Sequence, residues 1–336
     1  WIIAMHNTIE QTRMLSEVNV WMKKTATVRS LVDSLKSDTV REMYSFMENI
    51  KGSPQYWSVC RQELQAMVAH FGAPTFFVTC NPNEANMDDL REAYLKIHGA
   101  AATDKQNVYD LSKLDVPMYA RHNHFRFKAL FDNLFKNRKA AEGIFGKLEH
   151  YWYRIEYQMR GAPHCHMLLW IKDTPTLETS TEEEVIKFID GKITCRMPDP
   201  TTEPDLYNLV VKNQSHYCNP YCTKSFIQHK KVKTRCRFGF PLDSRRESVL
   251  NKELLDKADP MKRIRTYDLK RSEEARRVNA YNPALLLAWR GNVDVQYVGT
   301  TSLAVLEYVT SYVSKNESKS TGQGIDPFID RMDKSK

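Results

Sequence analysis

Apolar positions along this chain follow two periods, and the period changes from one segment to the next. The first 70 residues carry apolar side chains at helical spacing, as do Tyr56–Phe71 and Met87–His98. Thr75–Cys80 is instead a short apolar run between Gly-Ala-Pro and Asn-Pro-Asn, which is typical of a fully buried strand. This mixture predicts an α+β protein in which helices flank a sheet.

The rest of the chain continues this alternation. Residues 121–150 form a basic segment with an apolar side, and we expect them to be helical. Tyr151–Tyr157 and His164–Trp170 have strand character on either side of MRGAP, which predicts an antiparallel hairpin. We further expect a short helix, a charged helical segment, a strand and an amphipathic helix at Glu183–Gly191, 244–280, Asp294–Val298 and Ser302–Ser314.

The predicted hairpin carries candidate metal ligands. Successive side chains of a strand point to opposite faces, so His164 and His166 share a face while Cys165 lies on the other. Glu156 and Gln158 also share a face, which a hairpin can place beside the histidine pair. Two imidazoles and one carboxylate or amide oxygen suit a divalent metal that binds a substrate phosphate. The spacing leaves the third ligand open between Glu156 and Gln158.

A second His-x-His pair, His122 and His124, lies in a basic aromatic run without strand alternation. We interpret it as a helix start or a solvated basic face that could contact phosphates.

Cysteine and histidine residues gather between positions 193 and 241. A pattern of His-x-Cys-x3-Cys-x13-Cys, which fits a tetrahedral structural Zn²⁺ site, is formed by His216, Cys218, Cys222 and Cys236. Cys195 and His229 are substitutes if one of these four is not a ligand. The chain has seven cysteines, and this odd number favours metal binding in a reducing compartment over a disulfide framework.

Two tyrosines stand out in the predicted helix at Ser302–Ser314. Tyr308 and Tyr312 are four positions apart, so they lie on one helix face, and Lys315 follows the helix. Taken alone, tyrosines at this spacing are most often packing residues.

Composition narrows the class of protein. The chain has 336 residues, of which 42% are hydrophobic and 27% charged, as expected of a globular protein with a large core. No apolar run approaches the roughly 20 residues of a membrane span, so we expect no membrane partner. The net charge of +8 favours a polyanionic partner. Because the chain starts at Trp1 and lacks a signal-peptide pattern, we expect it to be a segment of a longer protein.

Three of these features follow in an order that resembles the HUH endonucleases of rolling-circle replication: the FFVT strand, the His-x-His hairpin, and the Tyr-x3-Tyr helix followed by Lys. Five motifs resemble, more specifically, the Rep-type nuclease domain of Helitron transposases over residues 50–316. These motifs are GSPQYWSVCRQELQAMVAHFGAPTFFVTCNPNE, EYQMRGAPHCHMLLWI, HYCNPYC with CRFGFP, YNPALLLAWRGNVDVQYV, and EYVTSYVSK.

The resemblance implies an α+β HUH nuclease fold, with a central antiparallel sheet flanked by helices. The implied parts are a helical N-terminal region, the first part of the nuclease domain, a zinc-binding insertion, the rest of the nuclease domain with the tyrosine helix, and a polar tail, at residues 1–70, 71–192, 193–241, 242–316 and 317–336. Under this resemblance His164 and His166 hold Mg²⁺ or Mn²⁺ with Glu156 or Gln158. Tyr308 and Tyr312 are then the paired nucleophiles.

The implied activity is nicking and strand transfer of single-stranded DNA through a 5′-phosphotyrosine, as in rolling-circle Helitron transposition. Basic side chains would hold the DNA backbone, and the candidates are Lys128, Lys136, Arg138, Lys230, Lys231, Arg237, Arg245, Arg246 and Lys315. A helicase domain is expected elsewhere in a longer chain, because these residues contain no G-x-x-x-x-G-K-[ST] motif. The expected location is nuclear in a eukaryote and otherwise soluble intracellular.

Two other functions compete with this one. The first is a catalytically inactive DNA-binding remnant that retains the fold and the zinc insertion. The second is a zinc hydrolase using His164 and His166, which gives the tyrosine pair no role.

Overall fold

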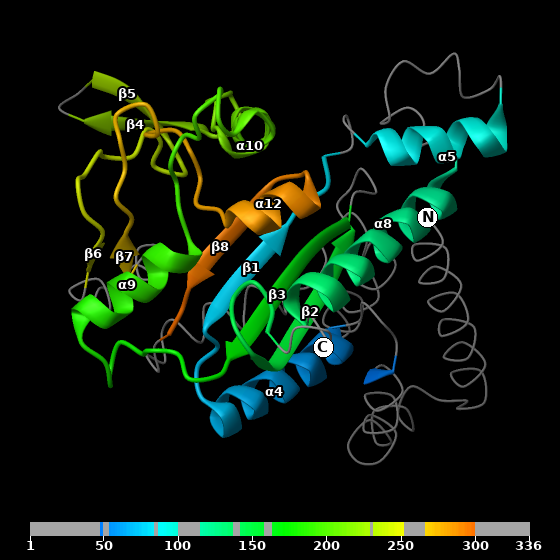
Figure 1. Ribbon diagram of the computed structural model, residues 1–336, viewed down its shortest axis with the longest axis horizontal. Coiled ribbons are helices and arrows are strands. Elements are labelled where there is room, and N and C mark those ends of the chain that lie inside the picture. Colours follow the sequence, from blue (N-terminus) through cyan, green and yellow to red (C-terminus); the bar gives the residue numbers. More distant parts are fainter. Residues whose placement is uncertain are drawn as a thin grey trace, which may run out of the picture.

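A four-stranded antiparallel sheet organises the protein (Figure 1). Its strand order is β2 (Leu148–Tyr157), β3 (Pro163–Ile171), β1 (Phe76–Cys80) and β8 (Val293–Tyr297). The strands β2 and β3 form the hairpin predicted from the sequence. β1 and β8 are the buried strand and the late strand, so the central antiparallel sheet flanked by helices is confirmed.

The computed structural model describes residues 48–49, 54–83, 87–99, 115–136, 142–157, 163–228, 231–251 and 266–299. Several predictions lie outside these residues: most of the helical N-terminal region, the tyrosine helix and the polar tail. The same holds for individual candidates, namely Arg138, Gln158, His229, Lys230, Tyr308, Tyr312 and Lys315.

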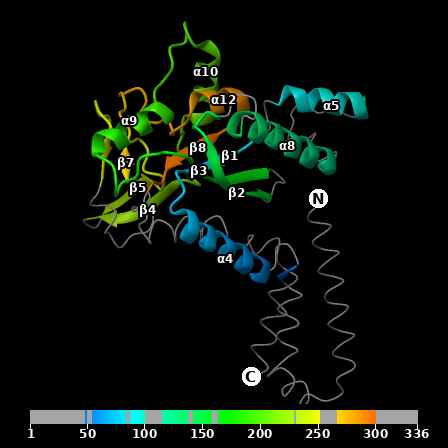
Figure 2. The ribbon, with the colours of Figure 1, turned by 60° about the horizontal axis from the view of Figure 1, so that its bottom comes forward.

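The two faces of the sheet pack against different helices. On one face, β1 and β3 contribute Phe76, Val78, Met167 and Leu169 to the main core. This core also contains side chains of α8 (Val116–Leu130), the π-helical turn η2 (Phe131–Phe135), α9 (Glu182–Lys192), α10 (Pro204–Leu209) and α12 (Pro283–Trp289). The sheet therefore has one extensively covered face, with α8 and α12 on the same side in Figure 2.

The opposite face carries a smaller core beneath α4 (Pro54–Phe71), which Figure 2 shows across the sheet from α8. Leu64 of α4 is fully buried against Phe77, Leu168 and Trp170. Truncating such a leucine typically costs about 2–5 kcal/mol of stability. The indole of Trp170 also donates to the Gly72 carbonyl at 2.9 Å, which anchors the end of α4. This face carries the histidine pair.

Local signals fix the helix starts. Asp115 precedes α8 and accepts a hydrogen bond from the Met118 N–H at 2.9 Å, and Pro117 occupies the first turn. Thr181 and Glu184 form a reciprocal capping box at α9. α5 (Asp88–His98) packs Leu90 and Tyr94 with Tyr119 of α8. In the described residues no helix is both long and apolar enough to cross a membrane.

The expectation that residues 121–150 are helical is wrong in part. α8 already begins at Val116, the helical conformation ends with η2 at Phe135, and β2 begins at Leu148. The chain reverses at Gly143, which pairs with Gly146, and the Ile144 N–H donates to the Leu134 carbonyl at 3.0 Å. This turn ends the helical segment despite its continuing basic and apolar pattern.

The expectation of a helix over 244–280 is also wrong in the part of this segment that the structure describes. Val249–Leu250 (β6) pairs with Tyr267–Asp268 (β7), and turns follow. Arg271 is buried and donates to the carbonyls of Ala275 and Val278 at 2.6 Å each. Tertiary hydrogen bonds thus override the helical propensity of this charged composition.

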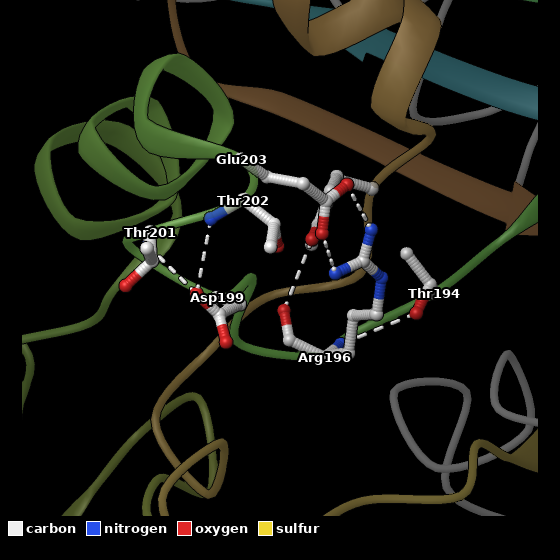
Figure 3. A network of polar contacts seen from close by, with 7 residues as sticks. Thr194, Arg196, Asp199, Thr201, Thr202 and Glu203 are labelled. Carbon is white, nitrogen blue, oxygen red and sulfur yellow. Dashed lines mark hydrogen bonds and ion pairs between the residues drawn. The ribbon is translucent and has the colours of Figure 1, made fainter.

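An ion-pair network holds the segment between α9 and α10 (Figure 3). The Arg196 guanidinium donates to both carboxylate oxygens of Glu203 at 2.6 Å, and Asp199 accepts from the backbone N–H groups of Thr201 and Thr202. The hydroxyl of Tyr281 donates to the Arg196 carbonyl at 3.0 Å. Because Tyr281 is fully buried, this bond ties the segment to the main core.

Candidate active site and metal centre

The histidine pair lies on β3, on the face covered by α4. His166 is 2% exposed and His164 is partly buried, with their ring centroids 4.3 Å apart. Cys165 is buried on the opposite face, in the main core, as strand alternation predicts. The ring of His166 also stacks on Phe77 of β1, with centroids 5.8 Å apart. Packing from two directions fixes the orientation of this imidazole.

Glu156 is the described carboxylate beside the pair. It lies directly opposite His164 in the β2–β3 register, and its Oε2 is 3.8 Å from Nε2 of His166. The His166 imidazole and the Arg154 guanidinium lower the pKa of the Glu156 carboxyl, and they outweigh the partial burial that raises it. Glu156 is therefore an anion facing two imidazoles, a donor set that suits a divalent metal.

Two further side chains adjoin His166 in the same cross-strand row. Thr79 of β1 pairs with His166, and its Oγ1 lies 3.2 Å from Nδ1 of the imidazole. Arg154 of β2 is the cross-strand partner on the other side. It is 4% exposed, and its guanidinium carbon lies 3.6 Å from the ring centroid of Trp57 in α4. A buried arginine stacked on an indole places a fixed positive charge beside the histidine pair.

Sequence reasoning missed Thr79, Arg154 and Trp57. The period of two could have identified Arg154, because it precedes Glu156 by two positions and so shares its face. Thr79 required the register between β1 and β3, which the sequence does not contain. Trp57 required the packing of α4 across the sheet.

The row continues to the edge strand and ends at a cavity. Asp294 of β8 pairs with Thr79, and Asp294 also accepts a hydrogen bond from the Asn279 amide at 3.2 Å. A cavity of about 150 Å³ opens here, and its polar lining residues include Asp243, Arg245, Asp268, Arg271, Asn279, Asp294 and Gln296. Polar groups thus extend from the histidine pair across the full width of the sheet.

The second His-x-His pair has a different environment. His122 and His124 lie inside α8, where two positions apart means opposite sides of the helix. Nε2 of His122 is 3.0 Å from Oδ2 of Asp89 in α5, and His124 is exposed. Burial lowers the pKa of His122, while Asp89 acts in the opposite direction. The two imidazoles therefore do not converge on one metal.

The predicted cysteine and histidine cluster comes together in space. The candidate ligand atoms of His216, Cys218, Cys222 and Cys236 all lie within 4.8 Å of one another. Nε2 of His216 is 3.2 Å from Sγ of Cys236. Among the described residues this is the group with enough converging ligand atoms for a metal, and three thiols with one imidazole suit Zn²⁺. Cys195 lies elsewhere, in the main core, where its thiol donates to the Lys270 carbonyl.

Protonation in this cluster favours metal binding at two ligands. Burial, with help from the nearby Arg277, lowers the pKa of His216, which favours the neutral imidazole that binds metals. Burial raises the pKa of the Cys236 thiol, but hydrogen bonds from the backbone at Phe238 and Phe240 and from the neighbouring thiols outweigh it. Its pKa is therefore lower than that of an ordinary cysteine.

The cluster is joined to the fold by backbone hydrogen bonds. The His216 N–H donates to the Arg277 carbonyl at 2.8 Å, and the Arg237 N–H donates to the Cys222 carbonyl at 2.7 Å. Between Cys222 and Cys236 the chain forms the hairpin of β4 (Thr223–Gln228) and β5 (Lys231–Cys236). The ligands thus lie at the base of a two-stranded projection.

The candidate DNA-binding side chains occupy several places. Lys128 is exposed on α8, while Lys136 donates to the Tyr151 hydroxyl at 3.1 Å, on the face opposite the histidine pair. Arg245 forms an ion pair with Asp268 at 3.2 Å, and Arg246 is exposed. Arg237 lies beside the metal cluster, and Lys231 begins β5. The candidates that the structure describes are therefore not gathered around the histidine pair.

Comparison with known protein families adds two matches. The Helitron helicase-like domain found at the N-terminus of its proteins matches residues 2–169, which is half of the chain. A family of replication-associated proteins of the Rep type matches residues 114–226. Both matches include the β2–β3 hairpin with the histidine pair. A search of curated proteins found no match. This chain belongs to the Helitron helicase-like N-terminal domain family and represents the N-terminal region of a Helitron transposase.

Proposed function

We propose that this chain is an HUH-type endonuclease and strand transferase that cuts single-stranded DNA through a tyrosine, as in rolling-circle transposition. The observation that carries the proposal is the arrangement of His164, His166 and Glu156. Two imidazoles share one strand face, and a carboxylate on the neighbouring strand lies opposite them, 3.8 Å from one imidazole nitrogen. This hairpin lies within both family matches, and both families suggest rolling-circle nicking.

The donor set fits a divalent cation. Glu156, His164 and His166 would hold Mg²⁺ or Mn²⁺, with Gln158 as the alternative to Glu156. When bound, the cation supplies charge that polarises the scissile phosphate. Thr79 orients His166 through Nδ1, and Arg154 adds a fixed positive charge near the phosphate.

Tyr308 and Tyr312 are the proposed nucleophiles. The phenol oxygen attacks phosphorus, the bond from phosphorus to the 3′-oxygen breaks, and the 3′-oxygen leaves with a proton as a hydroxyl group. The phenol loses its proton in the same step, which produces a 5′-phosphotyrosine and conserves the ester bond. A 3′-hydroxyl of another strand can reverse the attack, so two tyrosines allow two strands to be exchanged.

Two structural proposals accompany this chemistry. The cluster of His216, Cys218, Cys222 and Cys236 binds a structural Zn²⁺, which its ligand distances support. A helicase domain belongs to another part of a longer chain, and we expect no NTP hydrolysis by these residues because they lack a P-loop motif.

A covalent-adduct assay tests the function. The protein is incubated with single-stranded oligonucleotides and Mn²⁺, and adducts are detected on a denaturing gel. We expect an adduct that requires the divalent cation and disappears in the double variant Tyr308→Phe, Tyr312→Phe. Tyr151→Phe is the matched control, because this tyrosine lies on the other face of the sheet, and it should retain the adduct.

The same assay separates the competing functions. An adduct that persists in the double tyrosine variant would exclude both tyrosines as nucleophiles. Binding of single-stranded DNA without an adduct on any sequence would instead indicate the catalytically inactive DNA-binding remnant. Loss of Mn²⁺ affinity in Glu156→Gln but not in Gln158→Ala would identify the third ligand.

A further inference from the structure

Three large aromatic side chains are exposed around the metal cluster. Tyr217 is 68% exposed, Tyr221 is 74% exposed and Phe238 is 45% exposed. Each follows or precedes a cluster ligand within two positions of the sequence. Exposed aromatic rings gathered at one place, rather than scattered singly, mark an interaction site.

Arg237 joins two of these rings into one surface. Its guanidinium carbon lies 4.2 Å from the ring centroid of Tyr221 and 4.5 Å from that of Phe238. Phe238 in turn meets the ring of the cluster residue His216 edge-on, with centroids 5.6 Å apart. We call Tyr217, Tyr221, Arg237 and Phe238 the aromatic surface.

The charge of this segment is positive throughout. From Leu206 to Leu242 the sequence contains no aspartate or glutamate, and it contains seven basic residues: Lys212, Lys224, Lys230, Lys231, Lys233, Arg235 and Arg237. On the hairpin Lys224 and Arg235 are exposed cross-strand partners. A polyanion is therefore the complementary partner.

The aromatic surface is held in place by short-range bonds at the cluster. The Tyr221 N–H donates to the Asn219 side chain at 3.0 Å, and the Arg237 N–H donates to the Cys222 carbonyl at 2.7 Å. The two residues with stacked side chains are thus fixed to the same loop pair. Rigid rings lose little conformational freedom when they bind a ligand.

We propose that the aromatic surface stacks unpaired bases of single-stranded DNA, while Arg237 and the basic hairpin contact the phosphates. Interleaved aromatic rings and cations are the chemistry by which proteins bind single strands without sequence preference. Duplex DNA conceals its base faces, so the rings favour the single strand. This inference rests on the proposed function for the identity of the strand, and it assigns the cluster the role of positioning a DNA-binding surface.

Abasic DNA separates stacking from charge. We would measure the affinity of the protein for a thymidine strand of about 20 nucleotides, longer than the site of one single-strand-binding module, and for an abasic strand of equal length, by fluorescence anisotropy at fixed salt and without divalent cation. Replacing one stacking ring, in Tyr217→Ala or Tyr221→Ala, should weaken thymidine binding about tenfold. The same variants should bind the abasic strand within about twofold of the unmodified protein, because no base is present to stack.

Controls address folding and location. Tyr217→Phe and Tyr221→Phe retain a ring and should bind as the unmodified protein does, and every variant must retain its metal content. Phe125→Ala removes an aromatic side chain that is 66% exposed but lies on α8, so it should leave affinity unchanged. Arg237→Gln should weaken binding to both strands and reduce the salt dependence by about one phosphate contact.

Specific outcomes overturn the inference. Equal losses on the thymidine and abasic strands, or an equal loss in Phe125→Ala, would exclude base stacking at this surface, as would tighter binding to a matched duplex. These outcomes leave the adduct assay untouched. Conversely, stacking that holds while no tyrosine adduct forms would refute the proposed nuclease alone.

Discussion

Thr79 contacts His166 across two neighbouring strands, with 3.2 Å between Oγ1 of the threonine and Nδ1 of the imidazole. Because the hydroxyl engages Nδ1, the other ring nitrogen, Nε2, is the one that faces Glu156. Partners of this kind orient metal-binding histidines and fix their tautomer. The contact therefore makes Thr79 a positioning residue for the proposed divalent-metal site.

Thr79→Val should weaken metal binding while preserving the strand, because valine has nearly the same shape but lacks the hydroxyl. We expect Mn²⁺ affinity to fall about 10- to 100-fold, as is typical when an outer partner of a ligand is lost. Calorimetric titration with Mn²⁺ measures this loss. Thr79→Ser restores the hydroxyl and should restore affinity, and an unchanged affinity in Thr79→Val would show that the contact has no orienting role.

Gly143→Ala should destabilise the fold. A Cβ at this position would collide with the backbone carbonyls of Phe135 and Leu134, neither of which can move freely. The expected loss is about 1–3 kcal/mol of the free energy of unfolding, measured by urea denaturation. Gly191→Ala is the matched control: its Cβ meets nothing within 4 Å and it lies in α9. There alanine should stabilise by about 0.5–1 kcal/mol.

Removing one cluster ligand should release the structural metal. Cys222→Ser should reduce zinc from about one ion per chain to nearly none, because a four-ligand site then has three ligands and a weaker donor. Elemental analysis measures the zinc, and hydrogen exchange should show faster exchange in β4 and β5. Cys195→Ala should keep its zinc because this thiol lies in the main core; loss of zinc there would reassign the ligands.

Acid should weaken the Arg196–Glu203 pair. The two hydrogen bonds from Arg196 hold the pKa of Glu203 below its ordinary value of 4.5 in the folded protein. The contribution to stability is thus complete above pH 4.5 and is lost as the pH falls through the folded-state pKa. Urea denaturation from neutral to acid pH should show a shallower decline in Glu203→Gln than in the unmodified protein.

Salt and a control carboxylate test the same pair. Both side chains are more than one third exposed, so high salt should reduce the contribution. Glu247→Gln alters an exposed carboxylate elsewhere and should preserve the steeper decline. Identical pH profiles for Glu203→Gln and the unmodified protein would contradict the prediction.

The sequence was most informative where chemistry depends on local alternation. The period of two placed His164 and His166 on one face and Cys165 in the core, as the structure shows. Turn residues located the β2–β3 hairpin, and the spacing of His216, Cys218, Cys222 and Cys236 predicted a cluster that does assemble. The family was also recognisable from motifs, and its match confirms that prediction.

Sequence reasoning failed where distant contacts compete with local propensity. Residues 121–150 and 244–280 both look helical, but a turn at Gly143 and the buried side chain of Arg271 end or replace the helices. Basic residues such as Lys136 and Arg245 were grouped by charge alone, and the structure places them apart with partners of their own. Charge composition carries no information about which face a residue occupies.

By itself, the sequence determined the elements of the hairpin, the shared face of the two histidines and the ligand spacing of the cysteine cluster, because each depends on neighbours within one or two strands or loops. Only the tertiary structure decided that Thr79 and Arg154 flank His166, that Trp57 of α4 stacks on Arg154, and that the rings of Tyr221 and Phe238 share Arg237. These relationships depend on strand register and on helix packing, which are set by burial of the whole core rather than by local pattern.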